Sequence, residues 1–411
     1  MARIAVIGAG IIGASAAIWL LADGHEVIVF DADPDGLPTS SGNAALIALP
    51  EVAPIAGPGI LKTVPKWLLD PLGPLTVRWP DLPALTPWLA AFLMASRPSR
   101  AEAGRRALTG LMRTALADHV ALQSKAEAGD HLRQSGYISL HDSEASLRAG
   151  MREAAAVKAA LDFDFETLPP ARARQLVPQL EGSFAGAIHQ PAYRMVTNPL
   201  TMLRDYQRVV RVRGSLRQGR AIALEPQPGA VGVRLESGEL AAFDRVVVAA
   251  GVWSRDLVRQ LGLKVQLETE RGYNTTFHDL GWNLPMPVGF ADHGFVASPL
   301  VDGLRVGGAV ELACPQSSPN FARARAMRQK MRRYVPALPE EGGREWMGRR
   351  PSTPDSLPVI ALHPGDRRIA FAFGHGHLGL TLSAVTARLV AGLLTDGPTA
   401  ALQSFDIQRF Q

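Results

Sequence analysis

Three glycines and one acid near the start of the chain have the types and spacing of a phosphate- and ribose-binding turn. Gly8, Gly10 and Gly13 form a G-x-G-x-x-G pattern, and Asp31 follows further along. Gly8 permits a tight turn, Gly10 lets a pyrophosphate approach the backbone, and Gly13 lets a helix pack closely on a strand. The carboxylate of Asp31 can accept hydrogen bonds from a ribose. The four residues together predict a dinucleotide site.

The segments around these residues are the ones that such a site requires. Residues 4–7 are short, apolar and β-branched, which favours a buried strand. Residues 11–22 are typical of a helix, and residues 26–30 of a second strand that ends at Asp31. The start of the helix offers free N–H groups and a positive dipole end to the phosphates.

Two later segments also place small residues at the ends of predicted strands. An apolar strand at 245–249 runs into Ala250 and Gly251, which permit close approach of a ligand. A strand at 369–373 is followed by the glycine- and histidine-rich loop 374–379 and then by an apolar helix at 380–394. The sequence leaves open whether the histidines of this loop act in chemistry or are ordinary loop residues.

Length and composition indicate a globular protein of two domains. The 411 residues exceed one ordinary core, and 47% are hydrophobic while 20% are charged. No apolar run reaches the roughly 18 residues that span a membrane. The single cysteine, Cys314, excludes an internal disulfide and is expected to be an incidental thiol. No metal site is predicted.

The net charge of +5 comes mostly from arginine, with basic clusters at 204–220 and 323–333. Both clusters are expected to be solvated helix faces. They lack the interleaved aromatic residues that stack on bases, so no nucleic acid partner is predicted. Attraction to an anionic membrane surface stays open.

The middle of the chain predicts a second, mainly antiparallel unit. Long helices are expected at about 101–128 and 144–161, and strands at 273–277, 294–298 and 304–307. Strand-like runs at 221–224, 231–235 and 245–249 are expected to form a meander that returns to the first sheet. Residues 50–90 are rich in proline and tryptophan and predict an irregular cover with short helices.

Taken together, these motifs resemble the FAD-dependent D-amino acid oxidase and dehydrogenase superfamily, which includes glycine oxidase and sarcosine oxidase. The matching stretches are the opening unit and residues 39–44, 247–254, 350–355 and 374–381, in the family's order. The resemblance is greatest to the branch of D-amino acid and hydroxyproline dehydrogenases.

The resemblance implies FAD and a set of residues around it. The cofactor-binding positions that it implies are Gly8, Gly10, Gly13, Asp31, Ser40, Ser41, Asn43, Ala221, Ala250, Gly251, Gly376, Leu378, Gly379 and Thr381. Sarcosine oxidase-like members tether the flavin through a cysteine, but here the corresponding place reads Gly348-Arg349-Arg350. The FAD is therefore expected to be non-covalent.

The same resemblance implies a substrate site with Arg350, Tyr273 and His377 as its catalytic residues. Arg350 would bind the substrate carboxylate through its guanidinium, with Arg349 and Arg271 as rivals and a structural salt bridge as the alternative role. The tyrosine that helps to bind the carboxylate in glycine oxidase corresponds to Phe295. This leaves the part played by Tyr273 or Asn274 open.

The expected fold is α/β with antiparallel β: a Rossmann-like FAD-binding domain interleaved with a substrate domain on an antiparallel sheet. Residues 1–48, 190–262 and 345–411 are assigned to the discontinuous FAD-binding domain. Residues 49–189 and 263–344 are assigned to the substrate domain.

The leading functional hypothesis is FAD-dependent oxidation of the C–N bond of a D-amino acid or a cyclic or secondary imino acid, such as a hydroxyproline. Hydride would pass to the flavin, and a quinone or oxygen would then accept the electrons. The alternatives are an NAD-dependent dehydrogenase and a non-catalytic, flavin-holding subunit of a larger oxidoreductase. A cytoplasmic location is expected, with peripheral contact to the inner membrane or to another subunit as an open option.

Overall fold

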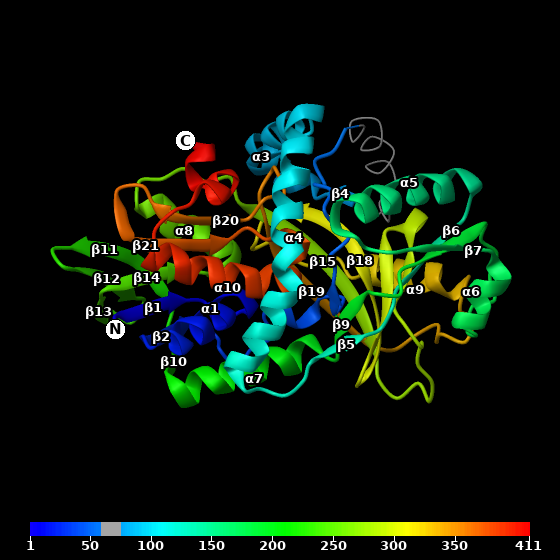
Figure 1. Cartoon of the computed structure of the whole chain (residues 1–411), viewed down its shortest axis with the longest axis horizontal. Coiled ribbons are helices and arrows are strands. Elements are labelled where there is room, and N and C mark those ends of the chain that lie inside the picture. The colour runs from blue at the N-terminus through cyan, green and yellow to red at the C-terminus, as the bar shows by residue number, and fades with distance from the viewer. Residues whose placement is uncertain (59–74) are drawn as a thin grey trace.

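The computed structural model describes residues 1–58 and 75–411, and two large β-sheets organise this part of the chain. In Figure 1 the sheet that carries the N-terminal strand lies at the left, and the larger sheet lies at the right. The long helix α4 (Pro98–Ala126) runs between the two parts.

The first sheet has six strands in the order β10-β2-β1-β14-β21-β20. Their bounds are β1 (Arg3–Ile7), β2 (Glu26–Asp31), β10 (Ser215–Gln218), β14 (Arg245–Val248), β20 (Val359–His363) and β21 (Asp366–Phe373). Neighbours pair in parallel except β20 and β21, which are antiparallel. The continuous apolar runs of β1, β2 and β14 fit central strands that are buried on both faces.

Helices cover one face of this sheet, and a small meander covers the other. The helical side consists of α1 (Ile11–Ala22), α7 (Pro199–Arg213), α10 (Gly379–Thr395) and α4, which share one hydrophobic core with the sheet. The other side carries β11 (Ala221–Gln227), β12 (Ala230–Leu235), β13 (Leu240–Phe243) and α8 (Ser254–Gln260). Because β10, β2, β1, β14 and β21 run in parallel, their carboxyl ends lie together at one edge of the sheet, which is where ligands bind in such sheets.

The second sheet has nine strands and forms the wall that faces this edge. Its path is β19-β15-β18-β17-β16-β6-β8-β7, and β4 pairs with β18. The bounds are β4 (Leu75–Val77), β6 (Ile138–His141), β7 (Glu166–Leu168), β8 (Gly186–His189), β15 (Glu268–Phe277), β16 (Val288–Phe290), β17 (Phe295–Leu300), β18 (Gly303–Ala313) and β19 (Arg344–Ser352). Around it lie α3 (Leu82–Ala95), α5 (Glu144–Leu161), α6 (Pro170–Leu176) and α9 (Ala322–Arg332).

A third small sheet lies between the two parts. It consists of β3 (Leu46–Ile47), β9 (Arg194–Val196) and β5 (Leu132–Gln134) in the order β3-β9-β5. Its strands connect the two parts along the chain: β3 follows β2 of the first sheet, and β5 precedes β6 of the second.

The expected fold class is confirmed, and several predicted elements are found at their predicted bounds. The helices 11–22 and 144–161 begin and end where the sequence predicts. The predicted meander is corrected in one respect: its third strand is β13, and the strand at 245 lies inside the first sheet between β1 and β21. Of the proline-rich cover, residues 59–74 lie outside the described chain.

The division into domains stays a prediction, but strand pairing places residues 345–352 in the nine-stranded sheet of the substrate side. Residues 345–352 were assigned to the FAD-binding domain, but β19 pairs along almost the whole of β15 in the nine-stranded sheet. Only the long-range pairing with β15 reveals this, because the sequence of β19 has no strand-like alternation of its own.

The expectation that the basic cluster at 323–333 is a solvated helix face is wrong for two of its arginines. Arg323 is 2% exposed and donates to Thr76 and to the carbonyl of Val310. Arg328 is also buried and donates to the carbonyl of Gly342. Helix α9 thus uses arginines to hold neighbouring backbone.

Within the described residues, one helical stretch, Gly376–Thr395, is long and apolar enough to cross a membrane by length and composition. Its most apolar window is 72% buried inside the molecule. Core helices of globular proteins meet the same criteria, and α10 packs against α1 and α4 at the centre of the first core.

Candidate active site

Two adjoining cavities lie where the edge of the six-stranded sheet meets the nine-stranded sheet. The larger, about 590 Å³, runs from the glycine turn after β1 to the loop before α10, and we call it the cofactor cavity. The smaller, about 390 Å³, lies against β15, β17 and β18, and we call it the substrate chamber. Both volumes are in the range of ligand sites. Five residues line both cavities: Gly42, Asn43, Arg350, His377 and Leu380.

Two of the three glycines in the turn after β1 are required by packing, whereas the third borders open space in the cofactor cavity. A Cβ on Gly8 would lie 2.5 Å from the carbonyl oxygen of Ala249, and one on Gly13 would lie 1.8 Å from that of Gly8. Those two glycines are therefore required by packing. At Gly10 a Cβ would meet only the hydroxyl oxygen of Ser40, at 3.6 Å, so the protein itself does not exclude a side chain there. Gly10, the N-cap residue of α1, has no side chain to cap the helix, so the N-terminal end of α1 can receive an anion at this point.

Asp31 lies at the end of β2 and lines the cofactor cavity, as the ribose-binding role requires. Its carboxylate also braces the turn, because it accepts hydrogen bonds from the backbone N–H of Ala9 at 2.7 Å and of Asp33 at 2.9 Å. The acid therefore shapes the cradle as well as offering oxygen atoms to a ligand.

Replacing Asp31 with alanine is expected to weaken FAD binding by about 10- to 150-fold. This corresponds to the roughly 1.5–3 kcal/mol of a hydrogen bond to a charged group. Titration of the apoprotein with FAD measures the change. Asp35→Ala is the control, since Asp35 lies in the same turn but is 79% exposed and pairs with Arg211. Equal FAD affinity of the two variants would show that Asp31 does not contribute to FAD binding.

The short loop after residue 38 is hydrogen-bonded to the start of α1 and to the nine-stranded sheet. Ser40 accepts a hydrogen bond from the backbone N–H of Ile11, and the side chain of Asn43 accepts one from the N–H of Ala45. From the other sheet, Arg305 donates to the carbonyls of Ser41 and Asn43, at 3.0 and 2.7 Å. Burial lowers the pKa of Arg305 to about 10, so the clamp stays charged at neutral pH.

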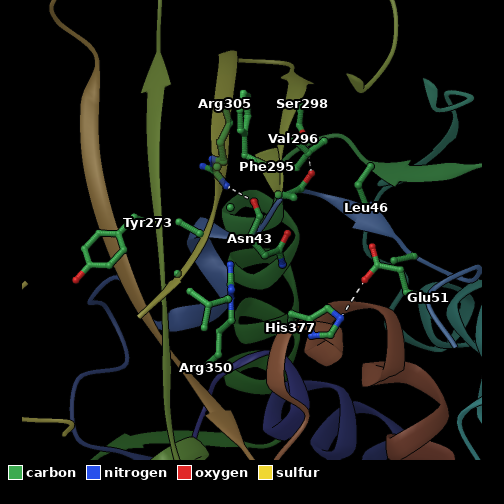
Figure 2. A pocket seen from close by; sticks show the side chains of 18 of the residues that line it. Asn43, Leu46, Glu51, Tyr273, Phe295, Val296, Ser298, Arg305, Arg350 and His377 are labelled. Atoms are coloured by element: carbon green, nitrogen blue, oxygen red, sulfur yellow. Dashed lines mark hydrogen bonds and ion pairs between the residues drawn. The ribbon is translucent and has the colours of Figure 1, made fainter. Parts of the chain in front are cut away.

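The loop before α10 places both of its histidines at the wall of the cofactor cavity, but only His377 also reaches the substrate chamber. His375 is buried and bonds Thr386 through Nε2 at 2.9 Å, and burial lowers its pKa to about 3. It is therefore a neutral structural residue. His377 lines both cavities and forms an ion pair with Glu51, with 3.0 Å between Nε2 and Oε2 (Figure 2).

Glu51 is charged when it pairs with His377. Partial desolvation disfavours its ionised form, but the hydrogen bond and charge of His377 and the charge of Arg350 outweigh this and lower the pKa of Glu51. The His377–Glu51 pair closes the side of the chamber opposite β15 and β18 (Figure 2).

Arg350 is the arginine that reaches the junction of the cavities, from β19. Its guanidinium lies over Gly272, where a Cβ would come within 2.3 Å of Nη2. No carboxylate of the described chain lies within 4.0 Å of it, so the alternative of a structural salt bridge finds no partner among those residues. Burial lowers the pKa of Arg350, while the charges of Glu270 and Glu51 oppose the change.

The rivals of Arg350 are engaged elsewhere. Arg271 is fully buried on the other face of β15, where it donates to the carbonyls of Cys314, Ser317 and Ser318. Arg349 lines the cofactor cavity but donates through Nε to the carbonyl of Pro315. Neither arginine lines the chamber.

The structure corrects the role expected of Tyr273. The residue borders the chamber, but its hydroxyl points away from it, donating to Glu311 and accepting from the backbone N–H of Asn320 (Figure 2). Side chains alternate along β15, so Tyr273 and Arg271 face α9 while Gly272 and Asn274 face the cofactor loop. Asn274 donates to the carbonyl of Gly42 at 2.8 Å.

Most of the cofactor residues that the resemblance implies border the cofactor cavity. Those that do so are Gly8, Gly10, Asp31, Ser40, Asn43, Ala221, Ala250, Gly251, Gly376 and Gly379. The others lie nearby in different roles. Gly13 packs against Gly8, Ser41 bonds the carbonyl of Pro38, Leu378 is buried, and Thr381 borders the chamber while accepting from the N–H of Ala48.

Three charged residues of the chamber were missed from the sequence: Glu51, Glu270 and Arg305. Glu51 lies in the proline-rich segment, which has no periodic pattern. A signal did exist for Arg305, since a charged residue inside an apolar strand such as β18 is rarely buried without a partner. Glu270 lies in the mostly polar strand β15, where a further charge does not stand out.

A dinucleotide cradle that adjoins a second cavity lined by charged residues is the arrangement of a flavin-dependent oxidoreductase. The comparison of sequences agrees, because the sequence model for FAD dependent oxidoreductases, DAO, matches residues 3–393. The chain belongs to this family, and its cofactor is FAD. No group of three His, Cys, Asp or Glu side chains that could hold a metal converges within residues 1–58 and 75–411.

Similar proteins extend over the whole chain. A D-amino-acid oxidase of Bradyrhizobium diazoefficiens is 34% identical over 99% of both chains. A D-amino acid dehydrogenase of Paramagnetospirillum magneticum is 32% identical, again over 99% of both. Among solved structures, glycine oxidase from Geobacillus kaustophilus has a TM-score of 0.76 at 21% identity, covering 100% of this chain and 99% of that one. At that identity the likeness speaks for the fold.

The FAD is predicted to be bound without a covalent link. Cys314 lines neither cavity, so no thiol is placed to attack the flavin. Denaturing the holoprotein and filtering it should carry all of the yellow colour into the filtrate. Colour that stays with the precipitated chain would show a covalent link through another residue, with His377 the first to test.

Proposed function

We propose that this protein oxidises the C–N bond of a D-amino acid or of a cyclic or secondary imino acid. Loss of a hydride from Cα and of a proton from the nitrogen gives an imine, which water hydrolyses to a keto acid and ammonia or an amine, whereas a proline-type ring gives a cyclic imine. The observation that carries the proposal is Arg350, a guanidinium without a carboxylate partner in the described chain, at the junction of the two cavities. Two relatives of full length, named as a D-amino acid oxidase and a D-amino acid dehydrogenase, support it.

Arg350 fixes the orientation of the substrate. A guanidinium makes two parallel hydrogen bonds to a carboxylate, which sets the direction of the Cα–H bond as well as the position of the charge. Because Arg350 borders both cavities, a carboxylate on its fork places Cα at their junction. FAD supplies the two-electron acceptor there, and hydride transfer from Cα is the chemistry that we assign to the site.

The rest of the chamber offers apolar contacts and room to the substrate side chain. Its apolar wall includes Phe290 and Phe295, whose rings stack at 4.5 Å between centroids, and Leu46 and Leu380 lie on the other sides. A volume of about 390 Å³ is large enough for an amino acid or a cyclic imino acid. Positioning in such a pocket supplies much of the rate of a reaction of this kind.

The start of α10 serves the cofactor side of the reaction. Gly376 and Gly379 line the cofactor cavity at the N-terminal end of this helix, and α10 has no side-chain cap. The positive end of the helix dipole stabilises negative charge that gathers on a reduced ligand.

We propose that either oxygen or a quinone accepts the electrons, since the relatives include an oxidase and dehydrogenases. Quinone reduction would bring the protein to a membrane surface, whereas oxygen would not. A chain that carries both a cofactor cradle and a carboxylate anchor favours a complete enzyme over the alternative of a flavin-holding subunit.

A substrate screen with both acceptors tests the proposal. The holoprotein is incubated with D- and L-amino acids, glycine, sarcosine, proline and hydroxyproline isomers, each with oxygen and with a soluble quinone analogue. We expect turnover with D-amino acids or imino acids and less with L-forms of open-chain amino acids. A holoprotein that oxidises none of them with either acceptor would favour the subunit role.

A further inference from the structure

Glu270 is a buried carboxylate of the chamber that has no partner. It lies on β15, is 4% exposed and borders the chamber. Its Oε2 has no hydrogen bond, and no arginine, lysine or histidine of the described residues comes within 4.0 Å of the carboxylate. Burying a charge without a partner is costly, so a group that completes the pair when it binds gains that energy.

The strand register places Glu270 beside the carboxylate anchor. Glu270 on β15 and Arg350 on β19 are direct cross-strand partners, and the side chains of such a pair lie on the same face of a sheet. The next residue on this face, Gly272, has no side chain, and the guanidinium of Arg350 turns over it. The opposite charges are thus neighbours on one wall, yet more than 4.0 Å apart and not bonded to each other.

A cation and an anion that stand side by side, each open toward one cavity, are complementary to a zwitterion. We propose that Glu270 binds the ammonium group of the substrate while Arg350 binds its carboxylate. This inference rests on the proposed function and narrows the substrate class. It predicts that the chamber binds zwitterionic amino and imino acids more tightly than 2-hydroxy acids of the same shape, which bring no positive charge to Glu270.

The other carboxylate of the chamber does not fit this role as well. Glu51 already has a side-chain partner, since its Oε2 lies 3.0 Å from Nε2 of His377. Its side chain is also 48% exposed, so it can be solvated without a ligand. Glu270 lacks both forms of compensation, which is why the ammonium group is assigned to it.

The decisive variant is Glu270→Gln, which keeps the size and removes the charge. The dissociation constant of a D-amino acid is taken from the concentration dependence of anaerobic flavin reduction. That of the matching 2-hydroxy acid is taken from its perturbation of the flavin spectrum. Loss of a charge-assisted hydrogen bond is worth roughly 1.5–3 kcal/mol, so the amino acid should bind about 10- to 150-fold more weakly. Binding of the hydroxy acid should be unchanged or tighter.

Two further variants and a measurement of FAD content serve as controls. Glu51→Gln, the matched control, should leave the ratio of the two dissociation constants close to the wild-type value, and Glu270→Asp should recover part of the amino acid affinity. FAD content measures the integrity of each variant, and Glu270→Asp carries the test if Glu270→Gln holds no FAD. Equal weakening of both ligands, or of neither, would overturn the assignment. Failure of the proposed function looks different: the wild-type flavin would then be reduced by no amino acid, whatever Glu270 does.

Discussion

Substituting Arg350 with alanine should lower kcat/KM for the amino acid substrate by a factor between about 30 and several thousand. Removing one partner of a buried charge pair costs roughly 2–5 kcal/mol, and each 1.4 kcal/mol is tenfold. The loss combines a weaker hold on the carboxylate with a less fixed direction of the Cα–H bond. Steady-state kinetics with the best substrate of the screen measures it.

Two further variants separate this role from a general effect of charge. Arg350→Lys should recover only part of the activity, because a single ammonium group cannot reproduce the two parallel bonds of a guanidinium. Arg344→Ala is the matched control, since Arg344 begins the same strand and is exposed. FAD content should stay normal in all three. Unchanged kcat/KM in Arg350→Ala would place the anchor elsewhere, with Arg305 the next cation of the chamber to test.

Gly10→Val should abolish stoichiometric FAD binding while leaving the fold intact. A Cβ at this position meets no protein atom closer than 3.6 Å, and Gly10 has no positive φ, so the backbone tolerates a side chain that begins here. The side chain would instead occupy the place where a pyrophosphate approaches the start of α1. Loss of two charge-assisted hydrogen bonds, at roughly 1.5–3 kcal/mol each, weakens binding by about 100-fold or more.

The measurement is FAD titration of the apoprotein, with circular dichroism and thermal unfolding as the check on the fold. Gly110→Ala is a suitable control because Gly110 lies on α4 and a Cβ there meets nothing within 4 Å. A Gly10→Val protein that binds FAD with wild-type affinity would show that the phosphates lie away from this turn.

The opening unit was predictable because everything that specifies it is local. The apolar run of β1, the glycines after it and the acid at the end of β2 follow one another within one short segment. Each has its own physical signature in the sequence. The loop before α10 was predictable for the same reason, since a strand, a glycine-rich loop and an apolar helix are consecutive.

The substrate side was harder to predict because strand pairing decides which side chains meet. Tyr273 and Glu270 lie on the same strand, yet the tyrosine hydroxyl bonds Glu311 away from the chamber while the glutamate borders it. Which face of β15 turns inward depends on its pairing with β19, far along the chain. No local pattern carries that information, so a resemblance could suggest Tyr273 but not its orientation.

Glu51 illustrates a third case, in which a loop residue reaches the site only through the tertiary fold. It follows the short strand β3 and meets His377 from the opposite end of the chain. Neither periodicity nor spacing links two residues so far apart. Only the packing of α10 beside β3 and the first core brings them together.

The most direct test of the account is anaerobic reduction of the bound flavin. The purified holoprotein is mixed without oxygen with a D-amino acid or imino acid chosen from the screen, and the visible flavin absorbance is followed. We predict complete bleaching by such a substrate in the wild type, and bleaching that is at least about 30-fold slower at subsaturating substrate in Arg350→Ala. A flavin that light or dithionite reduces, but that no amino or imino acid bleaches, would contradict the account.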